Sequence, residues 1–244
     1  MPQGPLGVVI IGETGVGKSA LVNLIAGKVL VDVSAEADIC TKRTTKYDIT
    51  IDSMHLRVWE IVGFNQPMDD KNPADKEISV IDVDLGTIFA HDKTAAVDVV
   101  LFCMRGERTR EITTKIFDSV RDMFGDQVPI VLVINHLELE KDMEEWWSRN
   151  EETLRTKKGI EGDGHVCVTG LLDHRNYKQS QEAVLAQLRV HYEARGNKTL
   201  ESIVLTYFGR LGHKKNLKEM LKKRYKIDQS TARRLVEALS PTNC

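Results

Sequence analysis

The stretch that most constrains the fold of this chain is an octapeptide with three glycines, Gly12-Glu13-Thr14-Gly15-Val16-Gly17-Lys18-Ser19. It follows the apolar run 8–11 and precedes the helix-like run 20–26. A strand, a glycine-rich loop and a helix in this order are what a phosphate-binding loop requires. The alternative, a chance match in a glycine-containing turn, would leave the two correct flanks unexplained.

The residue types in this loop fit nucleotide-phosphate chemistry. Glycines let backbone N–H groups curl around phosphate oxygens, Lys18 has the length to reach the outer phosphates, and the Ser19 hydroxyl is placed to ligate Mg²⁺. We therefore predict a nucleotide site with Mg²⁺ as cofactor. The residues expected to line it here are Gly12, Glu13, Thr14, Gly15, Val16, Gly17, Lys18, Ser19 and Ala20.

Length and charge limit the other classes of function. The 244 residues suffice for one large domain, or for a domain with a small appendage. A formal net charge of −2 argues against nucleic-acid binding through overall charge, so we expect no nucleic-acid partner. The four cysteines lack the spacing of a zinc site or a disulfide framework. No signal peptide or membrane-length apolar run is recognisable, which predicts a cytoplasmic protein.

Apolar runs and helical patterns alternate along the chain. The runs expected to be strands are 8–11, 46–51, 55–62, 97–103, 129–134 and 165–169, with 46–51 and 55–62 joined by a turn around Asp52-Ser53. The expected helices are 19–27, 111–124, 142–158 and 179–195, with a weaker pattern over 76–91. This alternation predicts an α/β fold, a mostly parallel sheet with helices on both faces. Ligands of such folds lie at the carboxyl ends of the strands.

The C-terminal part of the chain has a different pattern. Residues 198–244 are expected to form a small helical extension to a domain over residues 1–197. The extension carries two helical stripes and many lysines, which suit either contact with anionic lipid or nucleic acid, or docking on the domain with a solvated lysine face. The aromatic residues lie on the packing stripe, which favours docking.

Two further motifs follow predicted strands. In Glu60-Ile61-Val62-Gly63, Glu60 is placed to hold the metal through its water shell and Gly63 to sense a terminal phosphate. The alternative is a solvated carboxylate at a strand end. In Asn135-His136-Leu137-Glu138 the asparagine directly follows a buried strand. Here the alternative is an ordinary loop with a helix-capping asparagine.

Together these motifs resemble those of a GTPase G domain. The octapeptide is similar to those of septins, chloroplast import-receptor GTPases and, most closely, immunity-associated GTPases, and the resemblance covers the first four fifths of the chain. It implies Mg²⁺-dependent GTP binding and hydrolysis, and a nucleotide-dependent homodimer. The chain departs from the family pattern at Glu60, where aspartate is usual, and at His136 and Glu138, where the family has Asn-Lys-x-Asp.

The resemblance assigns roles to residues of the base site and of switch I. It implies that Glu138 accepts hydrogen bonds from the guanine ring, beside Asn135, His136 and Thr169. The segment 40–45 resembles switch I, in which Thr41 would bind the metal and the terminal phosphate, with Thr44 and Thr45 as alternatives. A threonine run before a strand is also plain β-propensity.

The residue after Gly63 bears on catalysis. Ras-like GTPases have a glutamine there that orients the attacking water, whereas this chain has Phe64. We expect slow intrinsic turnover, with the missing group supplied by a mobile loop or a facing subunit; the candidates are Gln66, Arg43 and Arg108. Residues 106–111 resemble the family's Gly-Arg-x-Thr-x-Glu, with Thr109 as the expected N-cap of the next helix.

Two other functions stay open at this stage. One is a phosphohydrolase of relaxed specificity, which accepts ATP as well as GTP or cleaves beyond the terminal phosphate. The other is a scaffold that assembles in response to nucleotide with little catalysis. A kinase is disfavoured because no acceptor-binding motif is evident.

Overall fold

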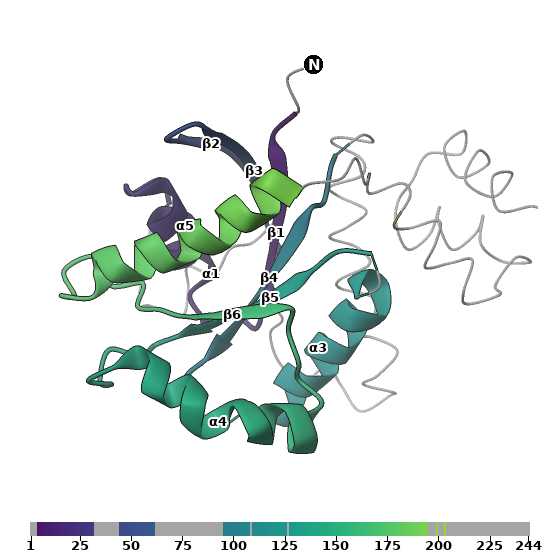
Figure 1. Ribbon diagram of the computed structural model, residues 1–244, viewed down its shortest axis with the longest axis vertical. Coiled ribbons are helices and arrows are strands. Elements are labelled where there is room, and N and C mark those ends of the chain that lie inside the picture. The colour runs from purple at the N-terminus through teal and green to yellow at the C-terminus, as the bar shows by residue number, and fades with distance from the viewer. Residues whose placement is uncertain are drawn as a thin grey trace, which may run out of the picture.

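The computed structural model of the protein describes residues 4–31, 44–61, 95–107, 109–125 and 127–194, together with Thr199 and Ile203. In this part of the chain a six-stranded sheet lies between helices (Figure 1). The strands are β1 (Leu6–Gly12), β2 (Thr45–Ile51), β3 (Met54–Glu60), β4 (Val99–Arg105), β5 (Ile130–Asn135) and β6 (Gly164–Cys167). The helices are α1 (Lys18–Ala26), α3 (Glu111–Phe124), α4 (Met143–Lys158) and α5 (Tyr177–Ala194). The predicted α/β fold is confirmed.

The strand order in the sheet is β2-β3-β1-β4-β5-β6. Every neighbouring pair is parallel except β2 and β3, which form the predicted hairpin with its turn at Asp52. The central strands β1, β4 and β5 are mostly apolar and are buried almost throughout, because helices cover both faces of the sheet. Since the parallel strands end at one edge, the loops that follow them gather there.

The side chains of β1 divide the core into two layers. Val8 and Ile10 belong to a buried cluster with apolar residues of α1 and α5. Val9 and Ile11 belong to a second cluster with apolar residues of α3 and α4. Figure 1 shows these two pairs of helices on opposite faces of the sheet. Because successive side chains of a strand point to opposite faces, both core clusters pack against β1. This packing holds β1, and the loop after it, in place.

Both ends of α4 follow local sequence signals, whereas the start of α3 does not. At α4 the Asp142 side chain accepts a hydrogen bond from the Glu144 backbone N–H at 3.0 Å, and Gly159 ends the helix in the left-handed conformation. The predicted N-cap of α3, Thr109, is wrong. The backbone enters the helix only at Glu111, so Arg110 occupies the N-cap position, and no described side chain caps it.

The paired tryptophans of α4 have different environments, as their adjacent positions predict. Trp146 is buried in the core, with 6% of its surface exposed. Trp147 is half-buried and stacks on His165 of β6 with ring centroids 3.9 Å apart. Helix α4 is thereby fixed against the edge strand β6.

The helix predicted over 76–91 lies outside the described residues, as does the predicted helical extension over 198–244 apart from Thr199 and Ile203. Thr199 pairs with Ala96, and Ile203 is buried in the cluster on the α3 and α4 side. These two residues thus contact the domain. None of the described helices is both long and apolar enough to cross a lipid bilayer.

Candidate nucleotide site

The glycine-rich octapeptide, called here the phosphate loop (residues 12–19), joins the end of β1 to the start of α1. Gly17 has a φ of 90°, a conformation that side-chain-bearing residues rarely adopt. No described side chain caps the first turn of α1, and no acidic residue lies in it. The positive end of the α1 dipole therefore favours an anion at this turn.

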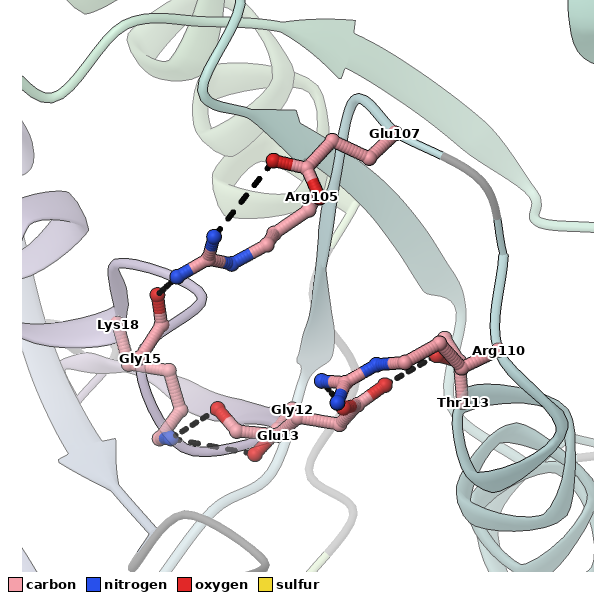
Figure 2. A network of polar contacts seen from close by, with 8 residues as sticks. All are labelled: Gly12, Glu13, Gly15, Lys18, Arg105, Glu107, Arg110 and Thr113. Atoms are coloured by element: carbon pink, nitrogen blue, oxygen red, sulfur yellow. Dashed lines mark hydrogen bonds and ion pairs between the residues drawn. The ribbon is translucent and has the colours of Figure 1, made fainter.

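Lys18 lies inside the phosphate loop. The residue is buried, with 6% of its surface exposed, and its Nζ donates hydrogen bonds to the backbone oxygens of Gly12 at 3.1 Å and Glu13 at 2.9 Å (Figure 2). These contacts hold an ammonium group within the curve of the loop. Its charge is placed where phosphate oxygens bound by the N–H groups would lie.

Ser19 and Glu60 bring two oxygen atoms together beside the phosphate loop. The Ser19 hydroxyl donates a hydrogen bond to Glu60 Oε1 at 2.6 Å. Glu60 ends β3 and is completely buried, so its interpretation as a solvated strand-end carboxylate is wrong. The pairing of β2 along β3 contributes to its burial, with Thr45 opposite Glu60. The sequence indicated the strand end and the hairpin, but not that the hairpin partner buries this carboxylate.

A tyrosine of β2 supports Glu60 from the other side. Tyr47 donates from its hydroxyl to Glu60 Oε2 at 3.4 Å. Burial, together with the negative charge of Glu60, raises the pKa of Tyr47 to about 12, so the phenol stays protonated and remains a donor. A buried carboxylate and a hydroxyl are oxygen donors of the type that Mg²⁺ prefers. The Ser19–Glu60 pair therefore fits the predicted cofactor.

Asn135 connects the phosphate loop to the loop after β5. Its Nδ2 donates to the Val16 backbone oxygen at 3.2 Å, and its Oδ1 accepts from the His136 N–H at 2.9 Å. A Cβ added to Gly17 would lie 2.0 Å from Asn135 Nδ2, so glycine is required for this approach. Asn135 does not cap a helix, and the interpretation of a helix-capping asparagine is wrong.

The residues predicted for the base site also converge. Thr169, which follows β6, donates from Oγ1 to Glu138 Oε1 at 2.8 Å, and its backbone N–H donates to Ser180 Oγ of α5 at 3.0 Å. His136 is exposed and has a φ of 63°. The next residue, Leu137, is buried in the core. The loops after β5 and β6 are thereby joined through one carboxylate.

A third group of residues, on the α3 side of the phosphate loop, was not predicted as a unit. Glu13 is buried, and its carboxylate accepts hydrogen bonds from Arg110 and Thr113 (Figure 2). Arg110 is therefore paired with a buried carboxylate. A cavity of about 380 Å³ lies here, lined by Glu13, Thr14, Val16, Met104, Arg105, Glu107, Thr109, Arg110 and Thr113. Glu13 and Arg110 are 97 residues apart, and no local pattern connects them.

The remaining predicted residues fall outside the described part of the chain. They are Thr41, Arg43, Gly63, Phe64, Gln66 and Arg108. Of the switch I alternatives, Thr44 is buried just before β2, and Thr45 begins that strand opposite Glu60.

Comparison with solved structures shows the same fold. A dimerization-deficient mutant of Toc33 from Arabidopsis thaliana is 17% identical with a TM-score of 0.51, over 75% of this chain and 85% of its own. A single-residue variant of Era from Aquifex aeolicus, bound to GDP.AlF4-, is 16% identical with a TM-score of 0.52, over 84% of this chain and 66% of its own. Era in complex with MgGDPNP and 16S ribosomal RNA nucleotides is 16% identical with a TM-score of 0.54, over 83% of this chain and 66% of its own.

Comparison with curated proteins finds no match. The family model described as 50S ribosome-binding GTPase matches residues 7–136, which is more than half of the chain. The matched stretch includes the phosphate loop, the Ser19–Glu60 pair and Asn135. The chain therefore belongs to the 50S ribosome-binding GTPase family, and its sheet and helices form a divergent P-loop GTPase G domain.

Proposed function

We propose that this protein binds GTP with Mg²⁺ and hydrolyses it slowly. The observation that carries the proposal is the bridge made by Asn135, which ties Val16 of the phosphate loop to the loop of Glu138. A phosphate-binding element and a carboxylate suited to a base are thus joined across one edge of the sheet. Membership of a GTPase family supports this pairing of functions.

In this proposal the phosphate loop and Lys18 bind the phosphates. Ser19 and Glu60 would hold Mg²⁺, with Thr41 as a further ligand and Gly63 at the terminal phosphate. When bound, the metal neutralises part of the phosphate charge. Solved Era contains MgGDPNP, which supports a magnesium–nucleotide complex in this fold.

Guanine would be read by Glu138. Its Oε1 accepts from Thr169, and this contact orients the carboxylate beside the exposed His136. A carboxylate accepts two hydrogen bonds from the N–H and amino groups of guanine. Adenine offers no such pair. Glutamate is one methylene longer than the family's aspartate, so the Thr169 contact fixes a more flexible side chain.

Thr169→Val is expected to weaken GTP affinity about tenfold, because a hydrogen bond to a charged acceptor is lost at nearly constant volume. ATP affinity should change less, so the GTP-to-ATP preference narrows. Titration calorimetry with both nucleotides measures this. Thr156→Val on α4 is the matched control, since that hydroxyl contacts the backbone oxygen of Glu152. An unchanged preference in the Thr169 variant would contradict the assignment.

Hydrolysis would depend on a group other than residue 64, because the phenyl ring of Phe64 cannot orient water. Gln66, Arg43 and Arg108 are candidates from the same chain or from a facing subunit. Toc33 has been solved as a dimerization-deficient mutant, which supports a dimer as the assembly to test. Turnover per chain should therefore rise with protein concentration. Sedimentation should resolve monomer and dimer over the same samples. If turnover per chain stays constant across a hundredfold range of protein concentration, the dimer model is wrong.

Two other activities compete with this proposal: relaxed phosphohydrolysis and nucleotide-dependent assembly without catalysis. Affinities for GTP, GDP, GMP and ATP, measured together with the products released over time, distinguish them. Selective binding of GTP and GDP with release of GDP supports the proposal. Equal ATP hydrolysis or release of GMP favours relaxed specificity, and binding without product favours assembly. Era is also solved with ribosomal RNA, but a net charge of −2 gives no argument for such a partner here.

A further inference from the structure

Glu13 is the second residue of the phosphate loop, but its side chain points away from the curve of the loop toward α3 (Figure 2). The side chain is 7% exposed, and both carboxylate oxygens are occupied: Arg110 binds Oε2 and Thr113 binds Oε1. A carboxylate buried without partners is costly, so these two contacts decide where Glu13 can lie.

The backbone of the same residue holds Lys18. The Glu13 carbonyl oxygen accepts a hydrogen bond from Lys18 Nζ at 2.9 Å. Glu13 thus connects two groups that never touch, the guanidinium of Arg110 at the start of α3 and the ammonium of Lys18 inside the loop. A displacement of the carboxylate would move the acceptor of the lysine.

Two further contacts fix the rest of the loop. Arg105, at the end of β4, donates from Nη2 to the Gly15 backbone oxygen at 2.9 Å, and Asn135 donates to Val16. Both act on the backbone of the loop's middle. The contacts of Arg110 and Thr113 act instead on Glu13. Lys18 donates to the backbone oxygens of Glu13 and of its neighbour Gly12.

The Arg110 side chain, which contacts Glu13, is accessible to solvent. The Arg110 side chain is 62% exposed and lines the cavity of about 380 Å³ together with Thr113. A displacement of Arg110 from the solvent side would therefore act on the buried carboxylate of Glu13.

We propose that Arg110 and Thr113 are positioning residues for phosphate binding, which act through Glu13 on Lys18. This inference rests on the proposed nucleotide function. It means that residues at the N-terminus of α3 influence how tightly the outer phosphates bind. The effect falls on the outer phosphates, because Lys18 serves those and not the base. GMP binding should therefore respond little.

The test measures affinities for GMP, GDP and a non-hydrolysable GTP analogue, with Mg²⁺, on the full chain. Arg110→Ala is expected to weaken GDP and GTP-analogue binding about tenfold, the loss typical of one charged hydrogen bond, and to leave GMP binding within twofold. Arg110→Lys should recover part of the loss. Adding Glu13→Gln to Arg110→Ala should cause little further loss, because both substitutions break one contact.

Lys115→Ala is the matched control, since Lys115 lies on α3 in an exposed pair with Glu111 at 3.1 Å. It should bind all three nucleotides like the unaltered protein. The proposal is overturned if Arg110→Ala lowers the melting temperature but keeps its GDP affinity, or if GMP, GDP and GTP-analogue affinities fall equally. If the unaltered protein binds none of these nucleotides, the proposed function fails instead.

Discussion

Lys18→Ala is expected to abolish GTP turnover and to weaken nucleotide binding. Lys18 is buried, and two backbone oxygens hold its ammonium group within the phosphate loop. The substitution therefore removes a fixed positive charge from the loop. Removing a preorganised charge from a site of developing negative charge typically costs a factor of about 10² or more in rate. Phosphate release under saturating GTP measures the effect.

Two companion variants separate chemistry from folding. Lys18→Met keeps most of the side-chain volume without the charge and should be as inactive as the alanine variant. Lys28→Ala removes an exposed lysine just beyond the end of α1 and should behave like the unaltered protein. Turnover within twofold of normal in Lys18→Met, with an unchanged melting temperature, would refute the assignment of the phosphate loop.

Gly17→Ala is the second substitution with a large expected effect. The φ of 90° is strained for alanine, and the new Cβ would lie 2.0 Å from Asn135 Nδ2. The side chain of Asn135 is held by Val16 and His136, so it cannot retreat without breaking the bridge between the two loops. We expect nucleotide affinity to fall about 100-fold, because the N–H groups proposed to bind phosphate would be displaced.

Gly159→Ala supplies the control for backbone strain alone. Gly159 ends α4 with a φ of 66°, and an added Cβ there would meet no atom within 4 Å. This substitution should cost about 1 kcal/mol of stability and leave nucleotide affinity unchanged. Equal loss of affinity in both glycine variants, measured by titration with fluorescent GDP, would show that strain and not the Asn135 contact is responsible.

Much of the fold follows from local sequence patterns. The runs that become β1, β4 and β5 are apolar enough to be buried on both faces, so their positions were predicted to within a few residues. The hairpin turn at Asp52 and the end of α4 at Gly159 follow from local chemistry in the same way. These elements could be predicted because each depends on residues that are close together in the sequence.

The arrangement of the site depends on the order of strands in the sheet, which local patterns do not encode. Glu60 meets Ser19 because β3 lies beside β1. Arg110 meets Glu13 because β4 lies beside β1. Thr109 has the better capping side chain, but the chain reaches helical geometry after Arg110. Of the described residues, the motifs predicted the phosphate loop, Glu60, Asn135 and Glu138 as parts of one site, and the order of the strands determines which side chains touch.

The two outermost strands of the sheet bear on how copies of this protein could associate. β2 presents Lys46 and Asp48, an exposed ion pair at 3.5 Å, and β6 has only four residues. Charged side chains and short length both discourage strand addition from a neighbouring molecule. Copies of this protein are therefore not expected to associate by extending the sheet, and any contact between them would leave both edge strands as they are.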